Sequence, residues 1–480
     1  MEGSAGALDH GTGGEERRRR LLVCLVVAAA LFMENMDSTV IATSLPAIAV
    51  DLHEDPVILK LAFTAYLLSL AVFIPASGWL ADRFGTRLVF RSAIIVFVLG
   101  SIACGLATSL ETLVAARILQ GLGGALMVPV GRLVLVRTVP KSELVGALAF
   151  VTMPALIGPV VGPPVGGFLT TYFHWRLIFW INVPVGILGL VAATLLIPDI
   201  REPESPPLDV KGFILSGLAL SLLIFGATLI GRDIASAWLV LGMLAGGVLL
   251  ALAYVRHARR VVRPIIDLNL LGIDTFRTSI LSGFLFRASI GSVPFLLPLL
   301  FQLQFGLTAF QSGSLTFAGA LGAILMKASA RRILGATGFR PVLIGSALLS
   351  SAFMAANTLF TPTTPHLVIV AVLLVGGFIR SLHFTSLAAL TFADIGQSDA
   401  SRATSFSGVA QQLAISTGVV IAALALEISR GLRGETALTI ADFDAAFLVV
   451  ACLSVGSAVL YLAMRADAGA ELIGRQESKR

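Results

Sequence analysis

Two carboxylate residues, Glu34 and Asp37, lie within the first long apolar stretch of the chain, residues 21–45. A bilayer hydrocarbon core of about 30 Å is spanned by about 20 apolar residues of helix. Placing an ionised side chain at the centre of such a span costs roughly 2.5–3.5 kcal/mol of insertion free energy. Two acids in one span therefore indicate that the carboxyl groups have a functional role. Because residues three apart share a helix face, both carboxyl groups are expected to point into one cavity. The pair predicts a protein that binds ions or protons inside a membrane.

A proton is the ion that this pair is best suited to bind. Burial favours the neutral form of a carboxyl group, and a second carboxylate nearby favours it further. Arg117 lies in the middle of the fourth apolar stretch and is the predicted partner, with Gln120 on the same helix face. A guanidinium opposite the carboxyl groups would favour their charged form, so a change in this distance would change the affinity for protons. A purely structural ion pair is the alternative interpretation.

Roughly 14 apolar stretches, each long enough to cross a bilayer, position these residues. They are predicted at 21–45, 57–80, 88–107, 110–133, 144–170, 175–197, 211–231, 236–255, 276–302, 310–330, 339–360, 365–392, 403–429 and 442–464. Lipid admits only helices or closed barrels, and these stretches are too long for barrel strands, so we expect an all-α polytopic membrane protein. The composition agrees, because 13% of the 480 residues are charged whereas a soluble domain carries about 25%.

The positive charge of the chain is explained by membrane topology. The net charge is +6, and most of the 34 Lys and Arg residues fall in the tails and in alternate loops. Cytoplasmic loops are enriched in these residues, so we expect both termini in the cytoplasm and a plasma (inner) membrane location, with no nucleic-acid partner. Cys24, Cys104 and Cys452 lie within spans without paired spacing, so neither a disulfide framework nor a metal site is predicted.

The order of the spans predicts a duplicated transporter body. Six spans are followed by two nearly uncharged ones and then by six more. The predicted parts are a disordered cytoplasmic tail at 1–20, an N-terminal six-helix bundle at 21–197, a linker with two extra transmembrane helices at 198–275, a C-terminal six-helix bundle at 276–464 and a cytoplasmic tail at 465–480. We interpret the two extra helices as lipid-facing elements between two functional halves.

The fifth span is rich in glycine and proline, which would destabilise an ordinary helix. Its motif consists of Gly158, Gly162, Pro163, Gly166 and Gly167. We predict a kink or hinge at this place, and a static packing kink is the alternative.

A short basic loop follows the second span and contains Gly78, Asp82, Arg83, Gly85 and Arg87. Anchoring on the cytoplasmic side explains the arginines but not Asp82. An Asp at this place is suited to cap the N-terminus of its own or a neighbouring helix. We predict a cytoplasmic latch that forms and breaks as the two halves move.

These four stretches resemble the major facilitator superfamily, specifically its 14-span drug:proton antiporter-2 branch of the EmrB/QacA type. The matching residues are Asp37, Thr39, Leu45 and Pro46 in the first span; Gly78, Leu80, Asp82, Arg83, Gly85 and Arg87 in the loop; Leu113, Arg117, Gln120, Gly121 and Gly123 in the fourth span; and Gly158, Gly162, Pro163, Gly166 and Gly167 in the fifth. The segments around Trp175 and Asn182 are also similar, whereas Ala42 and Thr86 depart from the usual Asn and basic residue. The resemblance implies the major facilitator fold, with about 14 transmembrane helices in two six-helix bundles and two extra central helices. It also implies alternating access and export.

The C-terminal half contributes most of the predicted substrate cavity. Its candidate residues, with one from the N-terminal half, are Gln120, Arg287, Arg380, His383, Gln411 and Gln412. The arginines within spans outnumber the two acids of the first span, a balance that would suit anionic or zwitterionic substrates. His383 is a second candidate for proton coupling because histidine titrates near neutral pH. For each of these residues, a structural contact is the alternative interpretation.

The predicted function is proton-coupled export of small amphiphilic compounds, with no cofactor besides the proton gradient. No phosphate-binding loop occurs, which disfavours ATP as the energy source. The alternative is export of a metabolic organic anion such as a citrate-like acid by the same fold. An enzyme is disfavoured because no metal-spaced cluster and no paired nucleophile and base occur near a membrane edge. A passive channel is disfavoured because most spans lack a polar stripe. Expected partners are a small-molecule substrate, protons and the lipid bilayer, and a periplasmic adaptor with an outer-membrane channel remains an open alternative.

Overall fold

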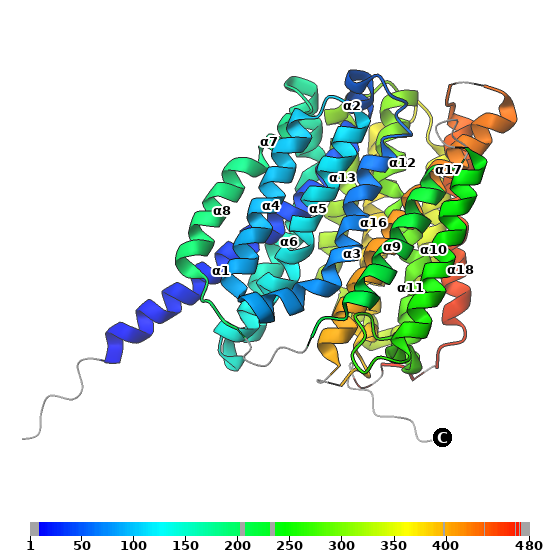
Figure 1. The fold of residues 1–480 in the computed structure, drawn as a ribbon. Helices are drawn as coiled ribbons and strands as arrows, with labels where there is room; N and C mark the ends of the chain where they lie inside the picture. The colour runs from blue at the N-terminus through cyan, green and yellow to red at the C-terminus, as the bar shows by residue number, and fades with distance from the viewer. Residues whose placement is uncertain are drawn as a thin grey trace, which may run out of the picture.

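The protein is built from long helices that run side by side (Figure 1). The computed structural model describes residues 9–201, 207–230, 236–396, 399–435, 437–465, 467–469 and 471. Within these residues the regular secondary structure is entirely helical. Helices satisfy their own backbone hydrogen bonds, as a chain inside lipid must.

The first part of the chain forms the helices that carry the predicted carboxylate site. They are α1 (Asp9–Val40), the 3-10 turn η1 (Ile41–Ser44), α2 (Leu45–Leu52), α3 (Lys60–Phe84), α4 (Thr86–Leu106), α5 (Leu110–Thr138), α6 (Lys141–Tyr172), α7 (Leu177–Trp180) and α8 (Asn182–Leu196). A hairpin of α9 (Val210–Thr228) and α10 (Ala237–Ala258) follows.

The last part of the chain repeats this pattern of long helices with short turns between them. Its elements are η2 (Leu268–Gly272), α11 (Asp274–Gly291), α12 (Val293–Leu299), η3 (Leu300–Gln304), α13 (Ala309–Lys327), α14 (Ala330–Thr337), α15 (Phe339–Ala356), η4 (Asn357–Leu359), α16 (His366–Thr391), α17 (Ala400–Arg433) and α18 (Ile440–Tyr461).

Every predicted span is occupied by helical segments, and the spans 175–197 and 276–302 each contain more than one. Thirteen helices of the described residues are long and apolar enough to cross a membrane. The remaining predicted span, the fifth, is occupied by α6, which has 32 residues. The predicted all-α polytopic membrane fold is therefore confirmed.

The first helix differs from the prediction at its N-terminal end. α1 begins at Asp9, so residues 9–20 are helical where a disordered tail is predicted. A helix that is already formed adds residues at little cost, so it continues beyond the apolar span. The remaining predicted tail residues 1–8 lie outside the described residues, as do parts of the predicted linker and of the predicted C-terminal tail.

The helices pack in two sets. The long helices of α1–α8 contact one another, as do those of α11–α18, and the sets meet mainly along α6–α13 and α3–α17. α9 packs on both α3 and α17, and α10 packs chiefly on α9. Few side chains of this hairpin are fully buried, as expected for elements that face lipid.

The two ends of the bundle are distinguished by the chain termini. We name the side on which α1 begins and α18 ends the terminal side, and the other the opposite side (Figure 1). On the opposite side, Lys60 Nζ at the start of α3 lies 2.9 Å from Glu427 Oε1 of α17. Arg430 Nη1, also of α17, donates to Asp55 Oδ2 at 3.0 Å. Two ion pairs therefore join the sets on this side.

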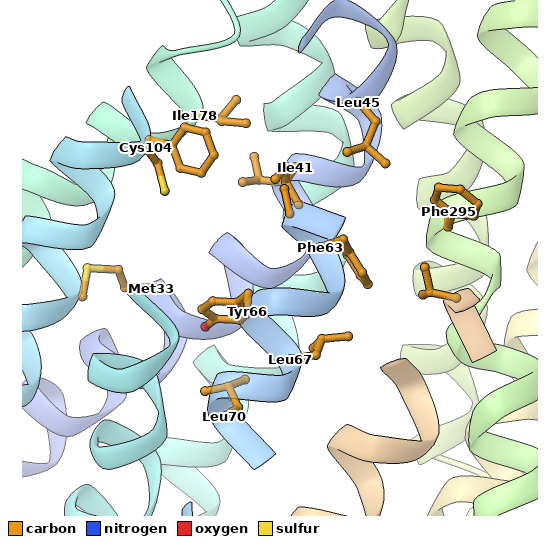
Figure 2. Close-up of a cluster of buried hydrophobic side chains, with 14 of the residues drawn as sticks. Met33, Ile41, Leu45, Phe63, Tyr66, Leu67, Leu70, Cys104, Ile178 and Phe295 are labelled. Carbon is orange, nitrogen blue, oxygen red and sulfur yellow. The ribbon is translucent and has the colours of Figure 1, made fainter. Parts of the chain in front are cut away.

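Apolar packing closes the same side. Ile41, Leu45 and Phe63 of the first set belong to one buried hydrophobic cluster with Phe295 of α12 (Figure 2). Gln302 Nε2 donates a hydrogen bond to a backbone carbonyl oxygen of the first set at 2.9 Å. The opposite side is thus sealed by a continuous core as well as by ion pairs.

Candidate functional site

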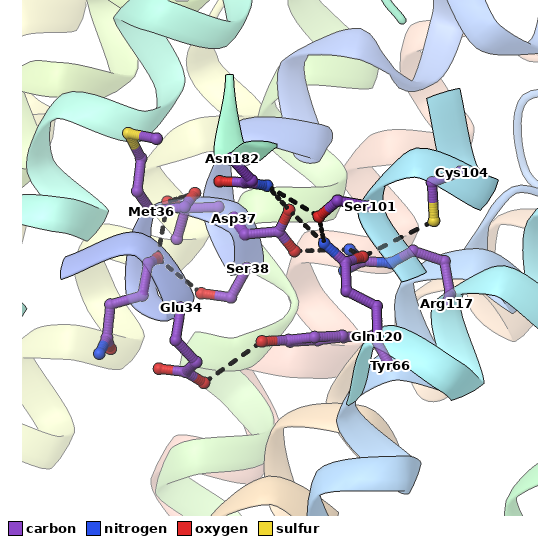
Figure 3. Close-up of polar contacts among 12 residues, drawn as sticks. Glu34, Met36, Asp37, Ser38, Tyr66, Ser101, Cys104, Arg117, Gln120 and Asn182 are labelled. Carbon is purple, nitrogen blue, oxygen red and sulfur yellow. Dashed lines mark hydrogen bonds and ion pairs between the residues drawn. The ribbon is translucent and has the colours of Figure 1, made fainter. Parts of the chain in front are cut away.

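Asp37 lies at the centre of a buried polar network between α1, α4, α5 and α8 (Figure 3). Arg117 Nη1 donates to its Oδ2 at 2.6 Å. Gln120 Nε2 and Asn182 Nδ2 donate to its Oδ1 at 2.8 and 2.7 Å. Ser101 Oγ accepts from both amides, and all five side chains are fully buried. An ionised carboxylate accepts on both oxygens, which suits this set of three donors.

Arg117 depends on Asp37 for its negative partner. Its guanidinium carbon lies 4.1 Å from the ring centroid of Tyr66 and 5.9 Å from that of Phe179. Such cation–π contacts contribute, but they do not neutralise a buried charge. Its Nε and Nη2 have no hydrogen-bond partner within the described residues. The predicted pairing of Arg117 with the first span is therefore present in the structure, through Asp37.

Glu34 has a different environment from Asp37. Its Oε1 accepts one hydrogen bond, from the hydroxyl of Tyr66 at 3.3 Å. It keeps 6% of its surface exposed. The two carboxyl groups of α1 thus do not share one contact set: Asp37 is held by three donors, and Glu34 by one neutral hydroxyl.

Three residues of this site are not predicted by the sequence pattern to be site residues. They are Tyr66, Ser101 and Asn182. Asn182 belongs to a segment that carries the family resemblance, and a lone amide within an apolar span is also a signal for a buried partner. Tyr66 and Ser101 are common residues in membrane helices, and nothing in their spacing indicates the contact.

The fifth-span motif packs directly against the helix that carries the carboxylates. A Cβ atom at Gly162 would lie 2.2 Å from Thr39 Oγ1, and one at Gly166 would lie 2.3 Å from the Val40 carbonyl oxygen. A Cβ atom at Gly158 would reach backbone atoms of α1 at 3.0 Å. Glycine at these positions lets α6 approach α1 closely. The motif therefore positions the carboxylate helix, and α6 itself is continuous across its four prolines.

α6 also touches the second set. A Cβ atom at Gly167 would lie 2.3 Å from the carbonyl oxygen of Ala309 in α13. In the other direction, a Cβ atom at Gly313 would lie 2.3 Å from the Pro163 carbonyl oxygen. The helix with the predicted hinge thus connects α1 to the second set, which is the place where a movement of one set against the other would reach the carboxylates.

Gly166→Ala is expected to destabilise the protein by about 1–3 kcal/mol, because the new methyl group meets backbone that cannot rotate away. Gly78→Ala is the matched control, because nothing lies within 4 Å of a Cβ atom there. Alanine is the better helix former by about 1 kcal/mol, so this control should be neutral or stabilising. Thermal unfolding in detergent measures both. Equal stability of the two variants would contradict the close packing of α6 on α1.

The loop motif places Asp82 against Arg137 of α5. Arg137 Nη2 donates to Asp82 Oδ1 at 2.8 Å, and Arg83 is exposed. The Asp82 contact joins α3 to α5, both of which belong to the first set. The described partner of Asp82 is thus within one half, and the latch between the halves stays a prediction.

Gly85, between α3 and α4, and Arg87, in the first turn of α4, contact the chain that follows α8. Gly85 has φ +96°, and a Cβ atom there would lie 2.2 Å from Asp199 Oδ1, so glycine is required. Arg87 Nε donates to the Ile197 carbonyl oxygen at 2.5 Å. The motif holds together the terminal side of the first set.

His383 lies in the core of the second set. Its Nδ1 and Nε2 lie 2.9 and 3.2 Å from the hydroxyl oxygens of Ser346 and Tyr461. Its ring stacks on Phe286 at 3.5 Å between centroids. Arg287 directly follows Phe286 in α11. Arg287 and His383 are thus brought close together, in a buried cluster between α11, α15, α16 and α18.

Arg380 lies apart from that cluster, beside α13. Its Nη2 would lie 2.8 Å from a Cβ atom at Gly319 of α13, and it lines a cavity between α12, α15 and α16. Gln411 is exposed and Gln412 is half-buried on α17. The six predicted cavity residues therefore do not form one site: Gln120 belongs to the Asp37 network, and Arg380 has a cavity of its own.

Known proteins with similar sequences align with this chain over most of its length. "Probable transport protein HsrA" of Haemophilus influenzae is 37% identical over 401 residues, which cover 84% of this chain and 86% of that protein. "Putative multidrug resistance protein MdtD" of Salmonella paratyphi A is 38% identical over 402 residues, which cover 82% and 84%.

Solved structures agree on the fold. A D-xylose–proton symporter superposes with a TM-score of 0.68 at 15% identity, covering 92% of this chain and 97% of that one. The human organic anion transporter MFSD10 superposes with a TM-score of 0.59 at 14% identity, covering 92% and 99%. The family described as the Major Facilitator Superfamily matches residues 27–419. This chain is therefore a transporter that belongs to the Major Facilitator Superfamily, as its motifs predict.

Proposed function

We propose that the protein is a proton-coupled antiporter that exports small amphiphilic compounds across the plasma (inner) membrane. The observation that carries this proposal is the pair of unlike carboxyl groups on α1: within the described residues, Asp37 is paired with a cation and Glu34 is not. The similarity to a relative named for multidrug resistance supports export of amphiphilic compounds. In this proposal both termini lie in the cytoplasm, and the opposite side faces outward.

Glu34 is the proposed proton carrier. A carboxyl group with one neutral donor can gain or lose a proton without breaking an ion pair, whereas Asp37 cannot. Tyr66 links the two groups, because its hydroxyl donates to Glu34 while its ring lies beneath the guanidinium of Arg117. Protonation of Glu34 weakens the hydrogen bond that it accepts from the Tyr66 hydroxyl, and so changes the surroundings of the Asp37–Arg117 pair.

Alternating access requires the outward side to open and close. In this structure that side is closed by the Lys60–Glu427 and Asp55–Arg430 pairs and by the apolar core around Phe295. Because α6 packs on both α1 and α13, opening would move α6 relative to the carboxylate helix. This route connects the proton site with the outward gate.

Glu34→Gln is expected to abolish uphill transport driven by a pH gradient and to leave substrate exchange intact. Glutamine can accept the same hydrogen bond from Tyr66 but cannot carry a proton, so the fold should be preserved. Uptake of a fluorescent cationic drug into inverted membrane vesicles, with and without a pH gradient, measures the coupling. Glu111→Gln, at an exposed carboxylate of α5, is the control and should behave as wild type. Undiminished uphill transport by Glu34→Gln would refute Glu34 as the carrier.

Export of an organic anion is the second candidate function. It is favoured by Arg287 and Arg380, which have no ion pair with a carboxylate within the described residues. Exporters of cations would be expected to present acids to their cargo. Counter-transport of a labelled organic acid against a cationic drug distinguishes the two candidates.

A further inference from the structure

We propose that the cavity beside Arg380 binds one small anionic group, either an inorganic anion such as chloride or the carboxylate of a transported molecule. The cavity lies within the second set, between α12, α15 and α16. Its use during transport rests on the proposed function, whereas binding of an anion there does not.

The size of the cavity limits its occupant. The free space is about 20 Å³, which is enough for roughly one water molecule or one ion of similar size. Apolar side chains, including Leu297, Phe353 and Leu373, form much of the wall. A whole drug molecule does not fit, so the occupant is a single small group.

Three polar side chains face this space. Arg380 lines it from the middle of α16, and Ser350 and Asn357 line it from α15 and the turn that follows. Ser350 and Asn357 are almost completely buried, with 2% and 4% of their surface exposed. Within the described residues, Ser350 Oγ and Asn357 Oδ1 have no hydrogen-bond partner. Buried polar atoms are normally hydrogen-bonded, so these two unpaired oxygen atoms point to a missing ligand.

The charge of the cavity selects an anion. Arg380 is a permanent cation in the middle of a membrane helix, where an uncompensated charge is costly. Within the described residues it forms no hydrogen bond or ion pair. Two carboxylates of the second set have other partners, since Glu427 pairs with Lys60 and Asp442 with Arg433.

The geometry of the donors agrees with this choice. A guanidinium fork and a serine hydroxyl both donate hydrogen bonds, and both are suited to a halide or a carboxylate oxygen. Asn357 Oδ1 is an acceptor and can hold a water molecule or a polar hydrogen beside the anion. Gly319 leaves the space that the guanidinium occupies, because a Cβ atom there would lie 2.8 Å from Arg380 Nη2.

The test is equilibrium binding of radioactive chloride and radioactive acetate to the purified full-length protein in detergent. Arg380→Gln should weaken the binding of the preferred anion by about a hundredfold, since it removes a charged donor. Ser350→Ala, which preserves the charge, should weaken it by about tenfold. Lys327→Gln is the matched control, because it removes a cation of the same half that bonds Thr385 and does not line the cavity. This control should bind as wild type.

Each outcome decides the proposal. Chloride binding that acetate does not compete with identifies an inorganic anion as the ligand. Displacement of chloride by acetate identifies a carboxylate as the ligand. Either result supports the site if Arg380→Gln abolishes the binding. Absence of saturable binding by wild type, or equal binding by wild type, Arg380→Gln and Ser350→Ala, would overturn it. Proton-driven drug export is measured on the same preparation. Export without anion binding refutes the site alone, whereas anion binding through Arg380 without proton-driven export refutes the proposed antiport alone.

Discussion

Asp37→Ala is expected to lower the free energy of unfolding by about 3–5 kcal/mol, because removing one partner of a buried ion pair leaves the other charge without compensation. Arg117 is fully buried, and Asp37 is its one ion-pair partner in the described residues. The amides of Gln120 and Asn182 lose an acceptor as well. Transport should be lost together with stability. Unfolding in detergent as a function of temperature measures the effect.

The double variant Asp37→Ala/Arg117→Met separates charge from packing. Replacement of both members of a buried pair by apolar groups is often nearly neutral, so this variant should regain much of the lost stability while remaining inactive. Asp274→Ala is the control, because Asp274 forms an exposed ion pair with Arg277. Exposed pairs contribute about 0–1 kcal/mol. An unfolding temperature of Asp37→Ala equal to that of the control would contradict the role of Asp37 in holding Arg117.

Lys60→Met is expected to shift the protein towards a state that is open on the opposite side. The Lys60 side chain is fully buried and lies 2.9 Å from a carboxylate of α17, 367 residues away in sequence. Breaking a buried pair costs about 3–5 kcal/mol, and every 1.4 kcal/mol changes an equilibrium about tenfold. This loss of free energy destabilises the closed state, because the pair joins the two halves in that state. We therefore expect the open population to rise by more than about a hundredfold.

A cysteine at Leu45 reports this opening. Leu45 is fully buried in the core that joins the two sets, so a membrane-impermeant maleimide reaches it only when the opposite side opens (Figure 2). Leu45→Cys in a background without Cys24, Cys104 and Cys452 should be labelled faster when Lys60→Met is added. Arg277→Met removes an exposed ion pair and should leave the rate unchanged. Equal labelling rates with and without Lys60→Met would show that this pair does not close the protein.

The two acids of α1 show where sequence reasoning reaches its limit. Their spacing marks them as a pair within a span, and Arg117, the predicted partner, contacts one of them, Asp37. Spacing does not reveal that Tyr66 lies between Glu34 and Arg117, or that Asn182 completes the set of donors around Asp37. These contacts depend on how α3 and α8 pack against α1.

The same limit applies to the other motifs. Asp82 is identifiable as more than a membrane anchor, but its contact with Arg137 within the first set requires the packing of α3 on α5. His383 is identifiable as titratable, but only the structure shows that it lies in the core of the second set, between Ser346 and Tyr461. A polar residue on a helix can face a cavity or a neighbouring helix, and periodicity alone does not distinguish the two.

The sequence by itself determined the membrane class, the positions of the spans and the family motifs, because a bilayer requires apolar segments of a set length and forces them to be helical. Tertiary structure alone decided which charges meet. The Lys60–Glu427 pair and the Arg380 cavity join residues from helices far apart in the chain. Their contacts result from the rotation and depth at which each helix packs, which local sequence does not specify.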